Sequence, residues 1–171
     1  MKKLVLAVVI ILSVGSVIAQ QKIAHVNSQK LLDTLPSRKA AIDQLKLFEQ
    51  NGVQELKEME ADFNKQVAIY EKARPTMSPV IIKIEEEKLM KKQQALEERQ
   101  QTLNTEMQAV SQELNKPILE RVQKAVEVVS DRKKLSYVID ETVTLYFKGG
   151  MDITSEVLVE LLRMDSEATK K

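Results

Sequence analysis

The sequence predicts an α+β protein that is mostly α, with a long αα-hairpin arm on a small β-containing body that copies of the chain complete together. Charged residues make up 30% of the chain and aromatic residues only 4%. This composition favours helices and lacks the large side chains that fill a globular core. Two long charged stretches flank a short segment that contains Pro75 and Pro79, and short alternating apolar segments lie toward both ends of the chain.

The segment 1–19 has the features of a secretory signal peptide. Lys2 and Lys3 precede an unbroken apolar run from Leu4 to Leu12, and Ala19 provides the small residue of a cleavage site. The alternative is an uncleaved membrane anchor, but about 15 apolar residues are fewer than the ~20 that span a bilayer. We therefore expect cleavage after Ala19 and a secreted mature chain.

Composition disfavours several classes of function. The chain has 26 Lys and Arg residues, and without Lys2 and Lys3 of the leader the remaining 24 nearly balance the 25 Asp and Glu residues. This balance and secretion both argue against nucleic acid as a partner. Cysteine is absent, so the stability of a secreted chain must come from helix packing or oligomerisation. The four glycines form no phosphate-binding loop, and we expect no cofactor and no enzymatic activity.

Residues 20–36 predict the first part of the body. Ile23 and Val26 lie in a short apolar segment that is typical of one strand. Ser28 is placed to cap a short helix, which Pro36 ends.

Residues 37–116 predict the arm, with its tip at 74–79. The first helix carries one apolar stripe with intervals of three and four residues, made of Ile42, Leu45, Phe48, Leu56, Met59, Phe63, Val67 and Tyr70. The second helix repeats an apolar residue every seven positions, at Ile82, Leu89, Leu96, Leu103 and Val110. The partner position of this heptad is polar at Glu86, Gln93 and Gln100, so the seam is only half filled.

Two such helices joined by a short loop fold back on each other. Counting outward from Met77 then predicts which residues face each other across the hairpin. Gly52 interrupts the first helix and Pro117 lies at the base of the second. Because glycine and proline both weaken a helix, we expect these two residues to act as hinges.

The tip carries apolar residues that have little to bury against. One interpretation is that Met77, Val80 and Ile81 pack on one another and close the hairpin. The other is that they form an adaptable contact for apolar clients, together with Leu89 and Leu96 of the half-filled seam. The sequence leaves both interpretations open.

Residues 117–163 predict the second part of the body. A helical pattern continues beyond Pro117, and a period of two then predicts two strands, one from Leu135, Tyr137 and Ile139 and one from Val143, Leu145 and Phe147. A last helix begins at Asp152 or Thr154, and residues 164–171 are expected to form a flexible tail.

A sheet of so few short strands has open edges and is unstable by itself. The sequence therefore predicts that several chains combine their strands in one sheet. The residues expected in this shared body are Ile23, Val26, Leu135, Tyr137, Ile139, Val143 and Leu145.

Three polar features of the sequence are candidates for a catalytic or metal-binding site. His25 is the only histidine, and a packing or hydrogen-bonding role is favoured over a catalytic or metal-binding one. The run Glu85–Glu87 is interpreted as a solvated helix face, because consecutive helical residues point in different directions. Asp140 and Glu141 lie where two predicted strands join, which favours a turn over an acid–base pair. No catalytic residue or metal ligand is therefore assigned.

In this order and spacing, the motifs resemble the Skp/OmpH family of periplasmic chaperones over essentially the whole mature chain. The motifs are KIAHVNSQKLL, the charged hairpin, KPILERVQKAVEVV, YVID and DITSEVL. The resemblance implies a homotrimer in which strands of three subunits form a small barrel and three arms enclose a cavity. It also implies an ATP-independent holdase that binds unfolded outer-membrane proteins and prevents their aggregation.

Two other classes of function remain. One is an enzyme, which would need a cluster of polar residues that the sequence does not show, and the other is a structural coiled-coil protein of the envelope without chaperone activity. Such a spacer needs neither a pooled strand body nor an apolar tip. The resemblance also admits a peripheral contact with the membrane or with lipopolysaccharide.

Overall fold

The structure is a computed structural model that describes residues 22–169. The signal peptide and cleavage site expected from the sequence lie outside these residues. The chain forms two compact units, one from Leu35 to Glu120 and the other from the segments before and after it. We call them the hairpin unit and the body unit. Among the described residues, no helix is both long and apolar enough to cross a membrane.

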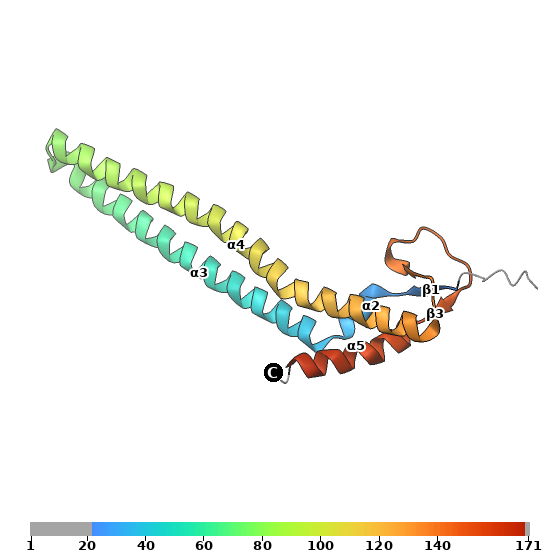
Figure 1. Cartoon of the computed structure of the whole chain (residues 1–171). Coiled ribbons are helices and arrows are strands. Elements are labelled where there is room, and N and C mark those ends of the chain that lie inside the picture. The colour runs from blue at the N-terminus through green and yellow to red at the C-terminus, as the bar shows by residue number, and fades with distance from the viewer. Residues whose placement is uncertain (1–21, 170–171) are drawn as a thin grey trace, which may run out of the picture. The chain divides into compact units, whose positions relative to one another are not determined.

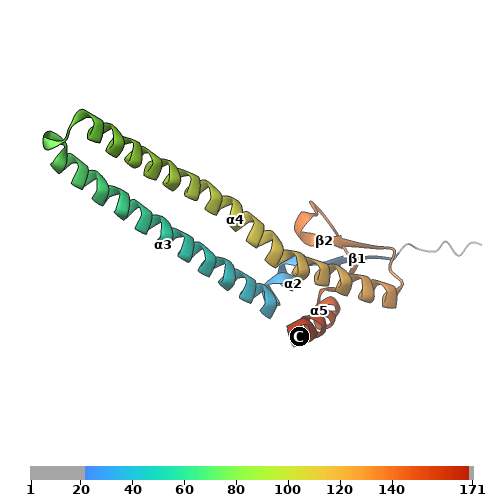
Figure 2. The ribbon, with the colours of Figure 1, turned by 60° about the vertical axis from the view of Figure 1, so that its left-hand side comes forward.

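Two long helices form the hairpin unit. Helix α3 spans Pro36–Ala73, the 3-10 turn η2 spans Arg74–Thr76, and helix α4 begins the second leg and spans Pro79–Lys133. The two legs run side by side and join at the tip in both views (Figures 1 and 2). Pro36 lies in the first turn of α3, where its missing N–H leaves no hydrogen bond unmade. The predicted hairpin is confirmed.

Contacts across the hairpin confirm the pairing predicted by counting from Met77. Lys92 forms an ion pair with Asp62, and these residues lie at equal distances in sequence on either side of Met77. The Nη2 atom of Arg99 lies 2.9 Å from Glu55 Oε2, and these two residues are also equally far from Met77. The register of the two legs follows from the position of the tip.

Gly52 is buried because α4 approaches it closely. A Cβ atom at this position would lie 2.3 Å from Cδ1 of Leu103 and 2.8 Å from its Cδ2. The Leu103 side chain, itself 5% exposed, therefore occupies the space that any larger residue would need. A larger residue here would displace the end of the Leu103 side chain, and the expected role of Gly52 as a hinge stays a prediction.

Helix α4 is continuous through Pro117. Proline removes one backbone donor and crowds the preceding turn, so this position is a local weakness within the helix. The expected hinge at Pro117 also stays a prediction. Residues 121–133 of α4 belong to the body unit.

The body unit contains a three-stranded parallel sheet. Strand β1 (Ile23–Val26) lies at the centre, between β2 (Tyr137–Asp140) and β3 (Met151–Asp152). Its Ile23 pairs with Tyr137, and its His25 pairs with both Ile139 and Asp152. The strands confirm the two segments predicted at Ile23–Val26 and at Leu135–Ile139.

Helix α2 (Ser28–Thr34), helix α5 (Thr154–Thr169) and the end of α4 cover one face of this sheet. Ala24 and Val26 of β1 are buried. Helix α2 packs against helix α5. The fully buried apolar residues of the body unit include Leu31, Ala125, Val129, Ile153, Val157 and Leu161. This core fixes the strands from their helical side.

The second strand predicted from Val143, Leu145 and Phe147 is wrong. After β2 the chain forms the 3-10 turn η3 (Glu141–Val143) and then an irregular loop up to β3. The carboxylate of Asp140 accepts a hydrogen bond from the backbone N–H of Thr142 at 3.0 Å, and the hydroxyl of Thr144 donates to the Asp140 carbonyl at 2.6 Å. These bonds close a turn, as expected for Asp140 and Glu141, and end the strand.

The flexible tail predicted for residues 164–171 is also wrong within the described chain, because α5 continues to Thr169. Asp165 is 2% exposed and lies 3.1 Å from the guanidinium of Arg121. The segment DSEATKK is polar throughout, but its Asp165 pairs with Arg121 on helix α4. This ion pair extends the packed part of α5 from Leu161 to Asp165, by about one turn.

We expect Asp165→Ala to destabilise the body unit strongly. The substitution leaves the Arg121 guanidinium poorly compensated in a largely buried position, at a cost of about 3 kcal/mol. The control is Glu167→Ala, because Glu167 pairs with Arg163 on the exposed side of the same helix. Thermal denaturation followed by circular dichroism should show a large fall in Tm for the first variant alone. Equal Tm values for the two variants would refute a stabilising role for the buried pair.

We expect Gly52→Ala to lower Tm although alanine favours helices over glycine by ~1 kcal/mol. The reason is the overlap of the new methyl group with the side chain of Leu103. In the background of Leu103→Ala, the same substitution should instead raise Tm. A double-mutant cycle measured by thermal denaturation tests this reversal of sign. A rise in Tm for Gly52→Ala alone would contradict the packing argument.

Candidate functional site

The tip of the hairpin presents apolar side chains to solvent. Val80 is 68% exposed and Ile81 is 44% exposed, whereas Met77 is partly buried. Val80 and Ile81 therefore do not close the end of the hairpin by burying themselves. Their exposure is what a contact for apolar clients requires, and their role in binding stays a prediction.

Polar contacts close the hairpin next to the tip instead. The hydroxyl of Tyr70 donates a hydrogen bond of 2.6 Å to Oε1 of Glu86, and Arg74 lies 3.8 Å from the same oxygen. The bond to the Glu86 carboxylate raises the pKa of Tyr70, since it stabilises the protonated phenol. The polar residue at one seam position is thus used by a specific partner on α3. The heptad pattern showed that Glu86 was polar but could not show this partner.

Further down the hairpin, Arg99 joins both legs. Its guanidinium contacts Glu55 on α3 and Glu106 on α4, each at 2.9 Å. The hydrogen bond from Arg99 lowers the pKa of Glu55, and the two carboxylates raise the pKa of Arg99. Exposed ion pairs of this kind add little stability but select one alignment of the two helices.

The arm exposes more apolar residues than sequence analysis identified. Leu89 and Leu96, expected to contact clients, are partly buried. Ile84 and Met90, on the same helix, are 42% and 64% exposed but do not belong to the heptad positions. The large apolar residues exposed on the hairpin unit are Ile42, Leu47, Val53, Ile69, Val80, Ile81, Ile84, Met90 and Leu119. For Ile84 and Met90, the signal that could have identified them was their position outside the heptad.

The Glu85–Glu87 run makes no shared cation site. Glu85 accepts a hydrogen bond of 2.7 Å from Lys88, while Glu86 binds Tyr70 on the opposite leg. Neighbouring carboxylates therefore point to different partners, as expected for a solvated helix face.

One face of the parallel sheet carries no helix, and the loop before β3 covers only part of it, since Phe147 packs against His25. Ile23, Tyr137 and Ile139 lie on this face and are 42–56% exposed. The following loop adds Val143 and Leu145, which are almost completely exposed. Parallel sheets are normally covered on both faces, so an apolar parallel face of this kind is incomplete in the single chain.

The other residues expected in the shared body are placed differently. Val26 is buried within the single chain, and Leu135 is partly buried. These two side chains belong to the core or its margin. The exposed set is thus smaller than the predicted one, but it includes both strands and the loop.

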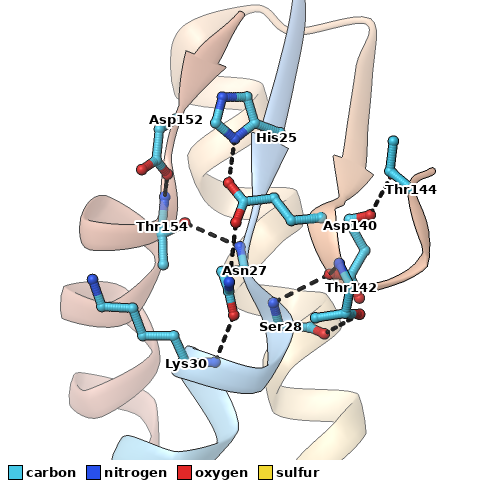
Figure 3. A network of polar contacts seen from close by, with 10 residues as sticks. His25, Asn27, Ser28, Lys30, Asp140, Thr142, Thr144, Asp152 and Thr154 are labelled. Carbon is cyan, nitrogen blue, oxygen red and sulfur yellow. Dashed lines mark hydrogen bonds and ion pairs between the residues drawn. The ribbon is translucent and has the colours of Figure 1, made fainter. Parts of the chain in front are cut away.

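His25 is held in a polar network at the end of the sheet (Figure 3). Its Nδ1 atom lies 2.6 Å from Oε1 of Glu141, and the Asn27 amide donates to Oε2 of the same carboxylate at 3.0 Å. The ring of Phe147 lies 4.9 Å from the imidazole, measured between ring centroids. The predicted packing and hydrogen-bonding role of His25 is confirmed.

Comparison with known proteins identifies one family. Residues 22–161 match the family model described as "Outer membrane protein (OmpH-like)". The chain is 30% identical over 165 residues to the chaperone protein Skp of Photorhabdus laumondii, and the match covers 94% of this chain and 99% of that protein. It is 27% identical to the chaperone protein Skp of Pectobacterium atrosepticum, with coverage of 86% and 89%.

A solved structure has the same fold. It is a putative outer membrane chaperone (OmpH-like) from Caulobacter crescentus, with a TM-score of 0.73 and 18% sequence identity. The superposition covers 83% of this chain and 84% of that one. At this identity the likeness shows the fold alone.

Proposed function

Since the chain belongs to the Skp/OmpH family of chaperones, we propose that it is a periplasmic holdase that binds unfolded outer-membrane proteins without ATP. The observation that carries this proposal is the apolar surface of the hairpin unit. Val80, Ile81, Ile84 and Met90 are all exposed within one stretch of α4. A strand of an outer-membrane barrel alternates apolar and polar residues, so each segment offers only a weak apolar contact. Many small exposed contacts suit such a client better than one deep pocket.

We further propose that the working form is a homotrimer assembled through the body unit. The face with Ile23, Tyr137 and Ile139 needs a partner, and a second copy offers the same apolar surface. Strand β2 lies at an edge of the sheet, where its outer backbone groups are available for pairing. Copies of one chain could satisfy both requirements. The number three rests on the family resemblance.

We expect Ile139→Asp to give a folded subunit that does not assemble. Ile139 is 42% exposed in the single chain, so a carboxylate there is tolerated before assembly but would be buried unpaired within a shared body. The matched control is Val159→Asp, an exposed apolar residue on α5 of the same unit. Sedimentation velocity should give a trimer for the parent and the control and a monomer for Ile139→Asp. A monomeric parent, or a trimeric Ile139→Asp variant, would exclude assembly through this face.

We expect the exposed apolar residues of the arm to be needed for client protection. Changing Val80, Ile81, Ile84 and Met90 together to serine removes apolar contact area worth up to ~25 cal/mol per Å² on binding. Because the four side chains are at least 42% exposed, the fold should survive. Light scattering during dilution of an unfolded outer-membrane barrel protein should then show a loss of aggregation suppression.

The control changes Lys83, Glu87 and Lys91 of the same helix to serine, which has a similar effect on helix propensity. If protection is lost in this control and kept in the apolar variant, charge and not apolar contact binds the client. A structural spacer would show no protection in the parent protein.

Replacing Asn51–Thr102 by a short turn removes most of the arm and keeps the body. We expect this variant to assemble like the parent but to lose client protection.

A further inference from the structure

Three metal-binding side chains meet at one end of the sheet. They are His25 from β1, Glu141 from η3 and Asp152 from β3, and their ligand atoms all lie within 4.8 Å of one another. Figure 3 shows His25 and Asp152 side by side at the ends of neighbouring strands. The register that pairs His25 with Asp152 places both side chains on the same face. Residues far apart in sequence are thus brought together by the parallel topology.

The donor set suits a borderline transition-metal ion. One imidazole nitrogen and two carboxylate oxygens are ligands of Zn²⁺, which takes three protein ligands and a water in many tetrahedral sites. Mg²⁺ and Ca²⁺ prefer oxygen ligands only, so the imidazole favours zinc over them. The ligand atoms need small side-chain rotations to reach the ~2.0–2.2 Å bond lengths of zinc. The hydrogen bond between His25 and Glu141 is replaced when the ion binds both.

Neighbouring groups already orient the two carboxylates. The Asn27 amide holds Oε2 of Glu141 at 3.0 Å, and the backbone N–H of Thr154 holds Oδ1 of Asp152 at 2.8 Å. Each carboxylate keeps a second oxygen for a metal. Contacts of this kind position ligands in metal sites and commonly affect affinity.

A cavity adjoins two of the three ligands, His25 and Glu141. It has a volume of about 50 Å³ and is also lined by Phe147 and the two glycines of the loop, among others. One water needs roughly 10–15 Å³ of such space. At Gly150, which has a φ of +103°, a Cβ atom would lie 3.2 Å from Cδ2 of His25. A larger residue at this position would therefore crowd the imidazole.

We propose that His25, Glu141 and Asp152 bind one Zn²⁺ ion per chain in a structural site. The ion ties both ends of the loop between β2 and β3 to the central strand. That loop carries Val143 and Leu145, whose side chains are otherwise exposed. A chain without cysteine has no disulfide to hold such a segment. The proposal does not depend on the chaperone function.

Isothermal titration of the metal-free mature chain, without a histidine tag, with ZnCl₂ tests the site. We expect one ion per chain and a fall in affinity of at least about tenfold in His25→Gln and in Asp152→Asn. Asparagine remains a good helix cap, so Asp152→Asn should keep the start of α5 intact. The control Glu58→Gln changes an exposed carboxylate of the hairpin unit and should bind zinc like the parent. Zinc should raise Tm in the parent and control only.

Three results would overturn the proposal. The first is no zinc binding by the parent. The second is equal affinity in the parent, His25→Gln and Asp152→Asn, which would mean adventitious binding elsewhere. The third is equally tight binding of Mg²⁺. Circular dichroism verifies the fold of each variant, and Glu141→Gln, which can still accept a bond from Asn27, repeats the test if one of the others fails to fold.

Discussion

The pairing of β1 with β2 is the interaction on which the body unit depends. The two strands are parallel and in register over four residues, yet about 110 residues of chain separate them. The intervening segment is mostly the hairpin unit, inserted between the two parts of the body. Because β1 also pairs with β3, this central strand is hydrogen-bonded to both other strands of the sheet. A defect in this strand would therefore release both C-terminal strands and the start of α5.

The same pairing determines what the body leaves open. Its register directs Ala24 and Val26 toward the helices and places Ile23 and His25 on the other face. No helix of the body unit covers Ile23, Tyr137 or Ile139, which stay exposed. A parallel sheet with one bare apolar face is stable only if something else covers it. The topology therefore leaves an apolar face that the proposed self-association would cover.

The hairpin was predictable from the sequence because its signals are local and repeated. Heptad spacing, two prolines at the tip and Met77 as the centre of symmetry were enough to place Asp62 opposite Lys92. The sequence also indicated β1 and β2, since alternation of apolar residues needs no knowledge of partners. The wrong second strand had the same alternation, but the side chain of Asp140 formed a turn in competition with it.

Long-range partners could not be predicted in the same way. Nothing in the C-terminal sequence indicates that Asp165 meets Arg121, since a helical acidic residue usually faces solvent. The cluster of His25, Glu141 and Asp152 likewise depends on strand register, which a single sequence does not give. For the candidate client site, Val80 and Ile81 were found because they adjoin a turn. The sequence did not indicate Ile84 and Met90, because neither residue lies at a position of the heptad.

The construction of the arm explains how apolar surface can remain available. A complete apolar seam would hold the two helices firmly and would place most large side chains between them. Here Tyr70, Arg99 and Lys92 supply polar links across the hairpin at spaced levels, each exposed and individually weak. Such links align the helices without burying apolar residues between them. Because the close contact of Gly52 with Leu103 adds one tight packing point, the register is kept while the outer stretch of α4 keeps its apolar side chains in solvent.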